Sequence, residues 1–241
     1  MGRITKYTMV GAIFFAIFLI VTVPATFVTE MLFDKKGPIK LYNVSGSAWS
    51  GKAGVLQLGD KQLQKFEWNL KAIPLIFGTI KMDFSFKIKS SSAKGTVAIS
   101  SFGSGDLYLE DTSINIKSEN VNDILPIPEP LILSGPLKVD IEELEISEKG
   151  IPVYAEGKAS WRKSTAIIGD KQYPLGEFDL GAYTEDEKVF LTIKDLKKEG
   201  PIEAKLNAEF KDNGDLLVSG ILGTRDTANK QLSSFARMLL Q

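Results

Sequence analysis

The sequence contains no cysteine and no histidine. Without cysteine the chain can form no disulfide, no thiolate metal site and no cysteine nucleophile. Without histidine it lacks the commonest general base and the commonest metal ligand. Carboxylates alone could still bind Ca²⁺ or Mg²⁺, or hydrolyse a glycoside. These absences therefore make an enzyme less expected and leave carboxylate chemistry as the enzymatic alternative.

An excess of one charge is also missing, since 29 Lys and Arg residues stand against 30 Asp and Glu residues. Nucleic-acid-binding domains concentrate basic charge on one surface, so we expect no nucleic-acid partner. The hydrophobic content of 44% and charged content of 24% are those of a folded globular chain rather than a disordered one.

Motifs for phosphate binding and nucleophilic catalysis are absent as well. No glycine-rich run precedes Lys-Ser or Lys-Thr at the spacing of a phosphate-binding loop. The segment from Gly46 to Gly51 has the outline of a nucleophile elbow, but Trp49 stands at its centre instead of serine. We therefore predict no catalytic, cofactor-binding or metal-binding residue and no cofactor.

Carboxylates cluster at 142–145 and at 185–187. We interpret both clusters as solvated charge that also protects sheet edges. The enzymatic alternative is a glycosidase acting on the cell wall through Glu110, Asp111 and Glu142. Amide substitutions of these three residues that leave function unchanged would exclude it.

The twenty residues from Met9 to Val28 contain no charged side chain. At ~1.5 Å per residue a helix over this run is ~30 Å long, which matches the hydrocarbon core of a membrane. Arg3 and Lys6 precede the run, and basic flanks stay in the cytoplasm. We predict a cytoplasmic N-terminus at 1–8, a transmembrane helix at 9–28 and an external remainder. The representative membrane residues are Met9, Phe14, Phe15, Phe18, Leu19 and Val28.

A cleaved signal peptide is the main alternative to this anchor. Its apolar region usually spans ~7–15 residues and precedes a small-x-small cleavage site. The apolar run here is longer, and Pro24-Ala25-Thr26 is a poor cleavage context. We therefore favour an uncleaved anchor.

Beyond residue 40 the apolar residues recur at every second position, which is the period of a β-strand. The same alternation occurs at 137–141 and 202–210, and glycine-containing turns such as Asn213-Gly214 separate the runs. The pattern predicts a twisted, mostly antiparallel sheet of about ten strands. It leaves open whether the sheet is an open groove or sandwich-like. The clearest apolar face is formed by Ile80, Met82, Phe84, Phe86 and Ile88.

Helix is scarce in the remainder of the chain. Residues 71–77 predict one short turn, limited by Pro74. Residues 226–240 predict an amphipathic helix, which we interpret as a lid over the open end of the sheet. A membrane-surface or partner-docking helix is the alternative.

The proline-rich stretch at 120–136 is predicted to join two halves of similar size. The predicted organisation is thus a linker at 29–38 and a β-rich external domain at 39–241. Trp49, Trp68 and Trp161 lie in strand-like contexts, where we expect core anchors. A ligand-facing or partner-facing role is the alternative for these tryptophans.

Several motifs occur in an order that covers nearly the whole chain: LYNVSGSAWSGKA at 41–53, a Trp strand at 66–68 and a Leu-x-x-Gly turn ending at Gly78. Strand starts at 134–137 and 157–161 follow, and then Leu175-Gly176. This order resembles the type II secretion system protein N family, although Ser47 stands where that family usually has threonine. The residues that carry the resemblance are Gly46, Trp49, Gly51, Trp68, Gly78 and Trp161.

The resemblance implies an inner-membrane protein with a periplasmic domain and no catalytic residues. It would be accessory to the apparatus that exports folded proteins across the outer membrane, with other secretion-system proteins as partners. The family is also similar to larger groove-forming β proteins that carry lipid between membranes. The alternative function is therefore a lipid-binding or lipid-transfer module, with the apolar face at 80–88 as its groove.

Overall fold

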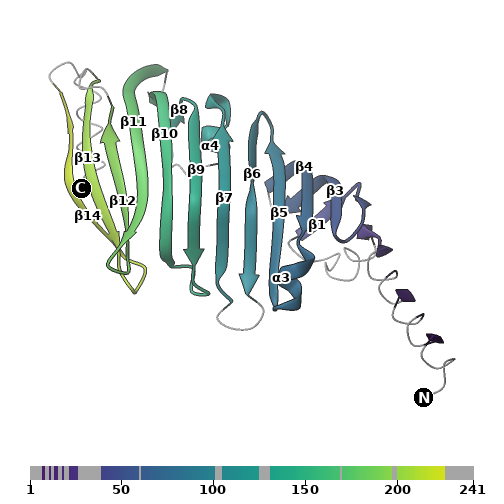
Figure 1. Ribbon diagram of the computed structural model, residues 1–241. Helices are drawn as coiled ribbons and strands as arrows, with labels where there is room; N and C mark the ends of the chain where they lie inside the picture. The colour runs from purple at the N-terminus through teal and green to yellow at the C-terminus, as the bar shows by residue number, and fades with distance from the viewer. Residues whose placement is uncertain are drawn as a thin grey trace. The chain divides into compact units, whose positions relative to one another are not determined.

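A computed structural model describes residues 7–8, 11, 14–15, 18, 22–26, 39–59, 61–100, 105–124, 131–168, 170–196 and 200–225. These residues are mostly antiparallel β-strand, which confirms the β-sheet part of the predicted fold class (Figure 1). Contacts divide the chain into two compact units, Met1–Ile88 and Lys89–Gln241.

The first unit contains a small antiparallel sheet. Its strands are β1 (Ile39–Tyr42), β2 (Ser45–Gly46), β3 (Ser50–Leu58), β4 (Lys61–Leu70) and β5 (Thr79–Ile88). Their order is β1-β3-β4-β5, and β2 pairs with the start of β3. The predicted strand at 80–88 is thus confirmed as β5.

A single helical turn, α3 (Ala72–Ile76), connects β4 to β5 and confirms the short turn predicted at 71–77. The N–H groups of Phe77 and Gly78 donate to the carbonyls of Pro74 and Leu75 and close the turn. Gly78 takes a φ of +74°, a left-handed conformation that favours glycine where a helix ends.

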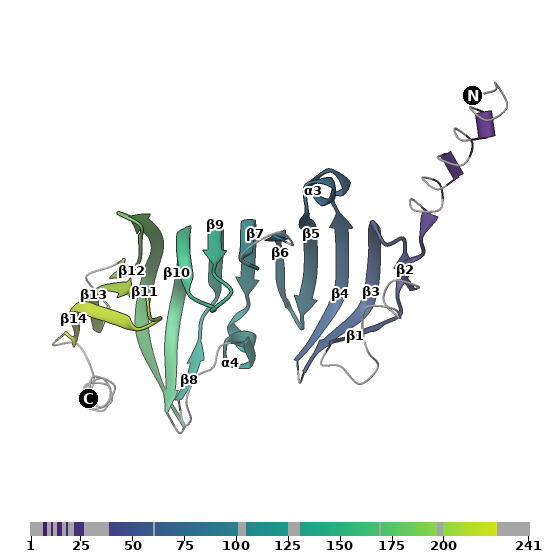
Figure 2. The same cartoon turned by 90° about the horizontal axis from the view of Figure 1, so that it is seen from below.

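The second unit contains the larger sheet, with the order β6-β7-β9-β10-β11-β12-β13-β14. Each pair along this order is antiparallel, and Figure 2 shows the strand direction twisting from β9 toward β14. The strands are β6 (Ser91–Ser100), β7 (Leu107–Ile116), β8 (Leu131–Ser134), β9 (Leu137–Ile146), β10 (Pro152–Ile168), β11 (Lys171–Glu185), β12 (Lys188–Asp195), β13 (Ile202–Phe210) and β14 (Leu216–Thr224).

The proline-rich stretch at 120–136 lies inside this second unit, whereas the boundary between the units lies at Ile88–Lys89. The reason is that β7 and β9 pair directly, from Leu107 opposite Ile146 to Ile116 opposite Leu137. The described part of the intervening chain forms η1 (Ser118–Asn120), α4 (Val121–Ile124) and β8, and β8 pairs with the end of β10. The stretch therefore connects two strands of the same sheet that pair directly with each other.

Turn chemistry explains the hairpin predicted at Asn213-Gly214, which joins β13 to β14. Gly214 takes a φ of +86° and donates its N–H to the carbonyl of Lys211. The side chain of Asn213 instead bonds Asp215, so only the glycine of the pair uses the left-handed region.

The core of the second unit lies where β10 and β11 bend. The register of the two strands shifts between Trp161 and Thr165, and the buried Ser164 hydroxyl donates to the carbonyl of Gly176 at 2.7 Å. Tyr173, Phe178, Ile202 and Ala204 form the buried cluster. Partly buried hydrophobic side chains pack against this cluster: Trp161, Leu175, Leu180, Ile193 and Leu222.

Most of the predicted membrane segment lies outside the described residues, as do the predicted linker at 29–38 and the predicted helix at 226–240. Phe14, Phe15 and Phe18 are described and exposed, whereas Met9, Leu19 and Val28 are not described. Within the described ranges, no helix has both the length and the apolar character needed to cross a membrane.

The described residues near Pro24 depart from a continuous helix over 9–28. Pro24 forms an antiparallel bridge with Ser47, and the carbonyl of Val23 accepts the N–H of Ala48 at 2.9 Å. Proline lacks an N–H and disfavours helical conformation in the residue before it, which explains the interruption. The end of the predicted span thus contacts the tryptophan motif of the first unit.

Candidate functional site

Two rows of side chains without charge cross one face of the second unit. Directly opposite residues on neighbouring strands point to the same face of a sheet, so register alone defines the rows. The first row is Ile114, Val139, Ala159, Leu180, Ile193, Leu206 and Gly220. The second row is Thr112, Ile141, Gly157, Ala182, Leu191, Ala208 and Val218. We call these the apolar rows.

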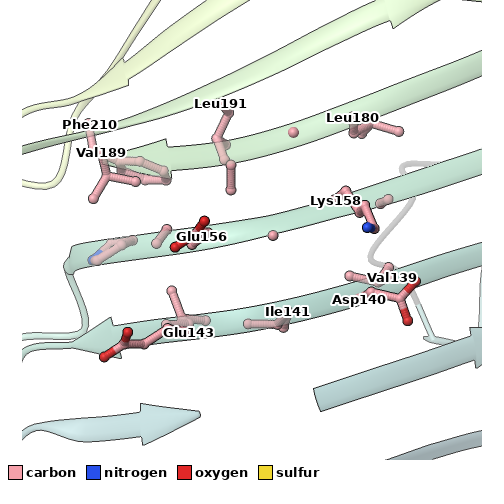
Figure 3. A pocket seen from close by; sticks show the side chains of 17 residues that line it. Val139, Asp140, Ile141, Glu143, Glu156, Lys158, Leu180, Val189, Leu191 and Phe210 are labelled. Carbon is pink, nitrogen blue, oxygen red and sulfur yellow. The ribbon is translucent and has the colours of Figure 1, made fainter. Parts of the chain in front are cut away.

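A hollow of about 320 Å³ lies where the apolar rows cross β9 to β12 (Figure 3). Residues of the central strand β10 are small, namely Ala155, Gly157 and Ala159, whereas β9 and β11 on either side supply Ile141 and Leu180. This contrast in side-chain volume creates the hollow. Gly157 is required there, because an added Cβ would lie 2.9 Å from the carbonyl oxygen of Asp140.

Charged residues around the hollow belong by register to the opposite face. Asp140 stands opposite Lys158, and Glu143 stands between Glu110 and Glu156 on its neighbouring strands. Adjacent carboxylates of this kind repel one another and stay in solvent. The polar face is therefore acidic at the point where the apolar face is hollow.

Asp140 illustrates how the polar face is stabilised. Its carboxylate accepts hydrogen bonds from Lys138 Nζ at 2.7 Å and from Ser113 Oγ at 2.9 Å. The hydrogen bond from Lys138 is the main cause that lowers the pKa of Asp140 below its usual value, and the bond from Ser113 is the second. Asp140 is thus a charged surface group with partners on two strands.

One ion pair lies at the edge of the apolar face. Asp195, opposite Phe178, accepts Arg225 Nη2 at 2.7 Å and the N–H of Ala204 at 3.0 Å. Burial by itself raises the pKa of Asp195, but the bonds from Ala204 and Arg225 outweigh it, and the pKa lies below the usual value. Arg225 also donates to the carbonyls of Gly200 and Ile202, so it fastens the end of β14 to neighbouring chain.

The residues of the tryptophan motif in the first unit form a structural cluster. Gly51 lies opposite Trp68, and a Cβ added to Gly51 would lie 2.3 Å from the indole ring. Trp68 donates its Nε1–H to the carbonyl of Ala48 at 3.1 Å and stacks on Phe66 with ring centroids 5.7 Å apart. Gly46 pairs with Gly51 and takes a φ of +95°. The structure therefore brings Gly46, Gly51 and Trp68 together.

Trp49 in the first unit and Trp161 in the second are the other two tryptophans expected to be core anchors. The backbone carbonyl of Trp49, which is half-buried, accepts the N–H of Leu70 at 2.6 Å. In the second unit, Trp161 donates its Nε1–H to the carbonyl of Gly135 at 3.2 Å and packs beside Phe178. An indole that binds a backbone carbonyl therefore occurs in each unit, as expected for structural anchors.

The face predicted as a groove at 80–88 belongs to the first unit, whereas the hollow belongs to the second. Ile80 is 45% exposed, and Met82, Phe84, Phe86 and Ile88 are half-buried. Phe84 and Phe86 stack with centroids 5.9 Å apart, and Trp68 lies opposite Phe84. Sequence reasoning missed the hollow, although the alternation of Ala155, Gly157 and Ala159 with polar residues was a readable signal.

The carboxylates considered for glycoside hydrolysis lie away from the hollow. Glu110, Glu143 and Glu156 lie side by side on the polar face and form an acidic row. Asp111, next to Glu110 in the sequence, is exposed and has a φ of +45°. Glu142 is exposed in the irregular part of β9 that faces β10. In the part of the chain that the structure describes, no three acidic groups are grouped so that they could hold a metal ion.

Comparison with known proteins agrees with the motif order. The family model described as "Type II secretion system (T2SS), protein N" matches residues 37–239. The chain belongs to the type II secretion system protein N family. The match begins just before β1 and includes every described strand, so the sheets of both units lie within the matched region.

A curated relative supports the same assignment. The type II secretion system protein N of Aeromonas hydrophila is 26% identical over 212 residues, which cover 85% of this chain and 80% of that protein. No solved structure matches the chain. Membership of the protein N family associates the chain with type II secretion, and the sequence-based resemblance is confirmed.

Proposed function

We propose that the chain is a non-enzymatic, inner-membrane accessory component of a type II secretion system, involved in exporting folded proteins across the outer membrane. The observation that carries the proposal is the family match over 37–239. The geometry supports the non-enzymatic part, because Trp68 and Trp161 donate to backbone carbonyls and Glu110, Glu143 and Glu156 lie together on the polar face. Other secretion-system proteins are its proposed partners. Cells that lack the chain should retain secreted cargo in the periplasm, and normal export would contradict the proposal.

The uncharged run at 9–28 supports the membrane part of this proposal. A single-pass anchor with residues 1–8 in the cytoplasm would place 39–241 in the periplasm. The absence of cysteine fits an oxidising compartment, where a free thiol is a liability. Residues 226–240 are proposed as an amphipathic lid over the open end of the sheet.

A lipid-binding module is the second candidate function, and the hollow on the apolar rows favours it. Its lining from β9 to β12 is mainly aliphatic, and its volume lies at the lower end of ligand-site volumes. An acyl chain fits such a lining because it needs no hydrogen bonds from the protein.

Native mass spectrometry of the full chain, purified from membranes in mild detergent, tests this second function. We expect copurifying lipid, and we expect Ala182→Phe to reduce it several-fold because the new ring fills the hollow. Ser160→Phe is the matched control, since Ser160 lies opposite Asp179 on the polar face and should leave lipid unchanged. Absence of lipid from the unmodified chain, or equal lipid in both variants, would contradict lipid binding.

A further inference from the structure

Among the described residues, the last strand of the second unit pairs along one edge only. β14 pairs with β13 from Leu216 opposite Phe210 to Thr224 opposite Ile202, and it pairs with no other described strand (Figure 1). Its sequence, LLVSGILGT, contains no charged residue. Leu217, Val218 and Ile221 are 56%, 54% and 56% exposed.

Such an edge is unusual for a protein that pairs with nothing. The free edge of a strand presents backbone donors and acceptors, and natural sheets protect it with charge, proline or short length. The inner strand β13 carries Glu203, Lys205 and Glu209, and β12 carries Lys188 and Lys194. Charge is thus present on β12 and β13, which have two neighbours each, and missing from β14, which pairs with one described strand.

The backbone edge determines the kind of partner. An extended strand is the ligand that satisfies a row of backbone groups, and the side chains decide which strand is accepted. Since β14 offers no charge, a partner needs none in return, and an identical edge meets this requirement without like-charge repulsion.

We propose that β14 pairs antiparallel with β14 of a second copy of this chain, about a two-fold axis near Gly220. In this register Val218 faces Leu222, and Ser219 faces Ile221 of the other copy. Antiparallel pairing with this register keeps each residue on its own face, so the apolar rows would continue from one copy into the next. The inference stands apart from the secretion role, because it rests on the edge alone.

The absence of cysteine makes a disulfide test unambiguous. Two tagged full-length copies, one with Ser219→Cys and one with Ile221→Cys, are expressed together and oxidised mildly in native membranes. We expect a mixed disulfide dimer at least about fivefold more abundant than with the control pair Asn207→Cys and Ile221→Cys. Asn207 lies opposite Ser219 on β13 and is also exposed, but it is one strand further from the proposed axis.

A charged edge provides a second test in the same cysteine background. Val218→Lys is tolerated by one copy because Val218 is exposed, but pairing would bury the ammonium group against Leu222 of the other copy. We expect the mixed disulfide to fall to the control level, whereas Asn207→Lys leaves it unchanged.

Three results would overturn the proposal. The first is equal crosslinking in the edge and control pairs, and the second is crosslinking that Val218→Lys does not change. The third is a disulfide between a cysteine at position 219 and one placed within 226–241 of the same copy, which would identify the chain's own end as the occupant of the edge.

Discussion

Trp68→Ala should lower the free energy of unfolding by about 3 kcal/mol. The indole lies on Gly51, stacks on Phe66 and donates to the carbonyl of Ala48, so its removal loses packing and a hydrogen bond together. Tryptophan-to-alanine changes cost ~3–5 kcal/mol in cores, and the half-burial of Trp68 sets the expectation at the lower end. Urea unfolding of the full chain in detergent, followed by far-UV circular dichroism, measures the change.

Trp68→Phe is the control for this experiment. It keeps a ring over Gly51 and beside Phe66 but removes the donor to Ala48, so it should cost about 1 kcal/mol. Gly51→Ala should resemble Trp68→Ala, because its Cβ cannot coexist with the observed ring position. An unfolding midpoint unchanged by Trp68→Ala would show that the glycine–tryptophan cluster does not stabilise the first unit.

Arg225→Met should destabilise the second unit by about 2 to 4 kcal/mol. The substitution leaves Asp195 without its cationic partner, and the side chain of Asp195 is only 13% exposed. It also removes the donors to the carbonyls of Gly200 and Ile202. The same urea measurement applies, with Lys138→Met as the matched control, because the side chain of Lys138 is 56% exposed in its ion pair with Asp140. The control should change stability by less than about 1 kcal/mol.

The pH dependence separates the charge from the packing in this pair. The pKa of Asp195 is lowered in the folded chain, so its stabilising contribution is present above the ordinary aspartate pKa and is lost as the pH falls toward the lowered value. In Arg225→Met the pKa of Asp195 should rise instead, since burial then acts with less compensation. The stability gap between the two proteins should therefore narrow as the pH falls.

A double variant checks this interpretation. Asp195→Asn in the Arg225→Met background should recover part of the lost stability, because it removes the unpaired charge. The ion pair would contribute nothing through its charge under two joint results. The first is a difference in unfolding free energy between the unmodified chain and Arg225→Met that stays constant with pH, and the second is additive effects of Arg225→Met and Asp195→Asn.

The strands were predictable because their signal is local. Alternation at 80–88, 137–141 and 202–210 has the period of a strand, and these segments form the strands β5, β9 and β13. Among these three strands, burial alternates clearly in β13, whereas most residues of β5 are half-buried on both faces. The turn at α3 was predictable from Pro74, and the hairpin before β14 from Gly214.

Pairing between distant strands was not predictable from such local signals. The unit boundary at Ile88–Lys89 depends on which strands pair. Because β7 pairs directly with β9, the proline-rich stretch connects two neighbouring strands of one sheet. The acidic row of Glu110, Glu143 and Glu156 likewise exists only through register.

The hollow was missed because small residues carry a weak hydrophobic signal. The groove was predicted at 80–88 because the apolar residues there are large. The hollow instead forms where Ala155, Gly157 and Ala159 leave space between larger neighbours. An alternation of small and polar residues in a central strand therefore indicates a hollow as well as a strand.

Export of cargo tests the central claim most directly. The measurement is the fraction of a type II secretion cargo in the medium and in the periplasm, in cells that lack the chain and in cells that regain it. We predict that loss of the chain moves cargo from the medium to the periplasm, that the full chain restores export, and that the chain with Trp68→Ala restores it less well. Undiminished export in cells without the chain would contradict a role in type II secretion.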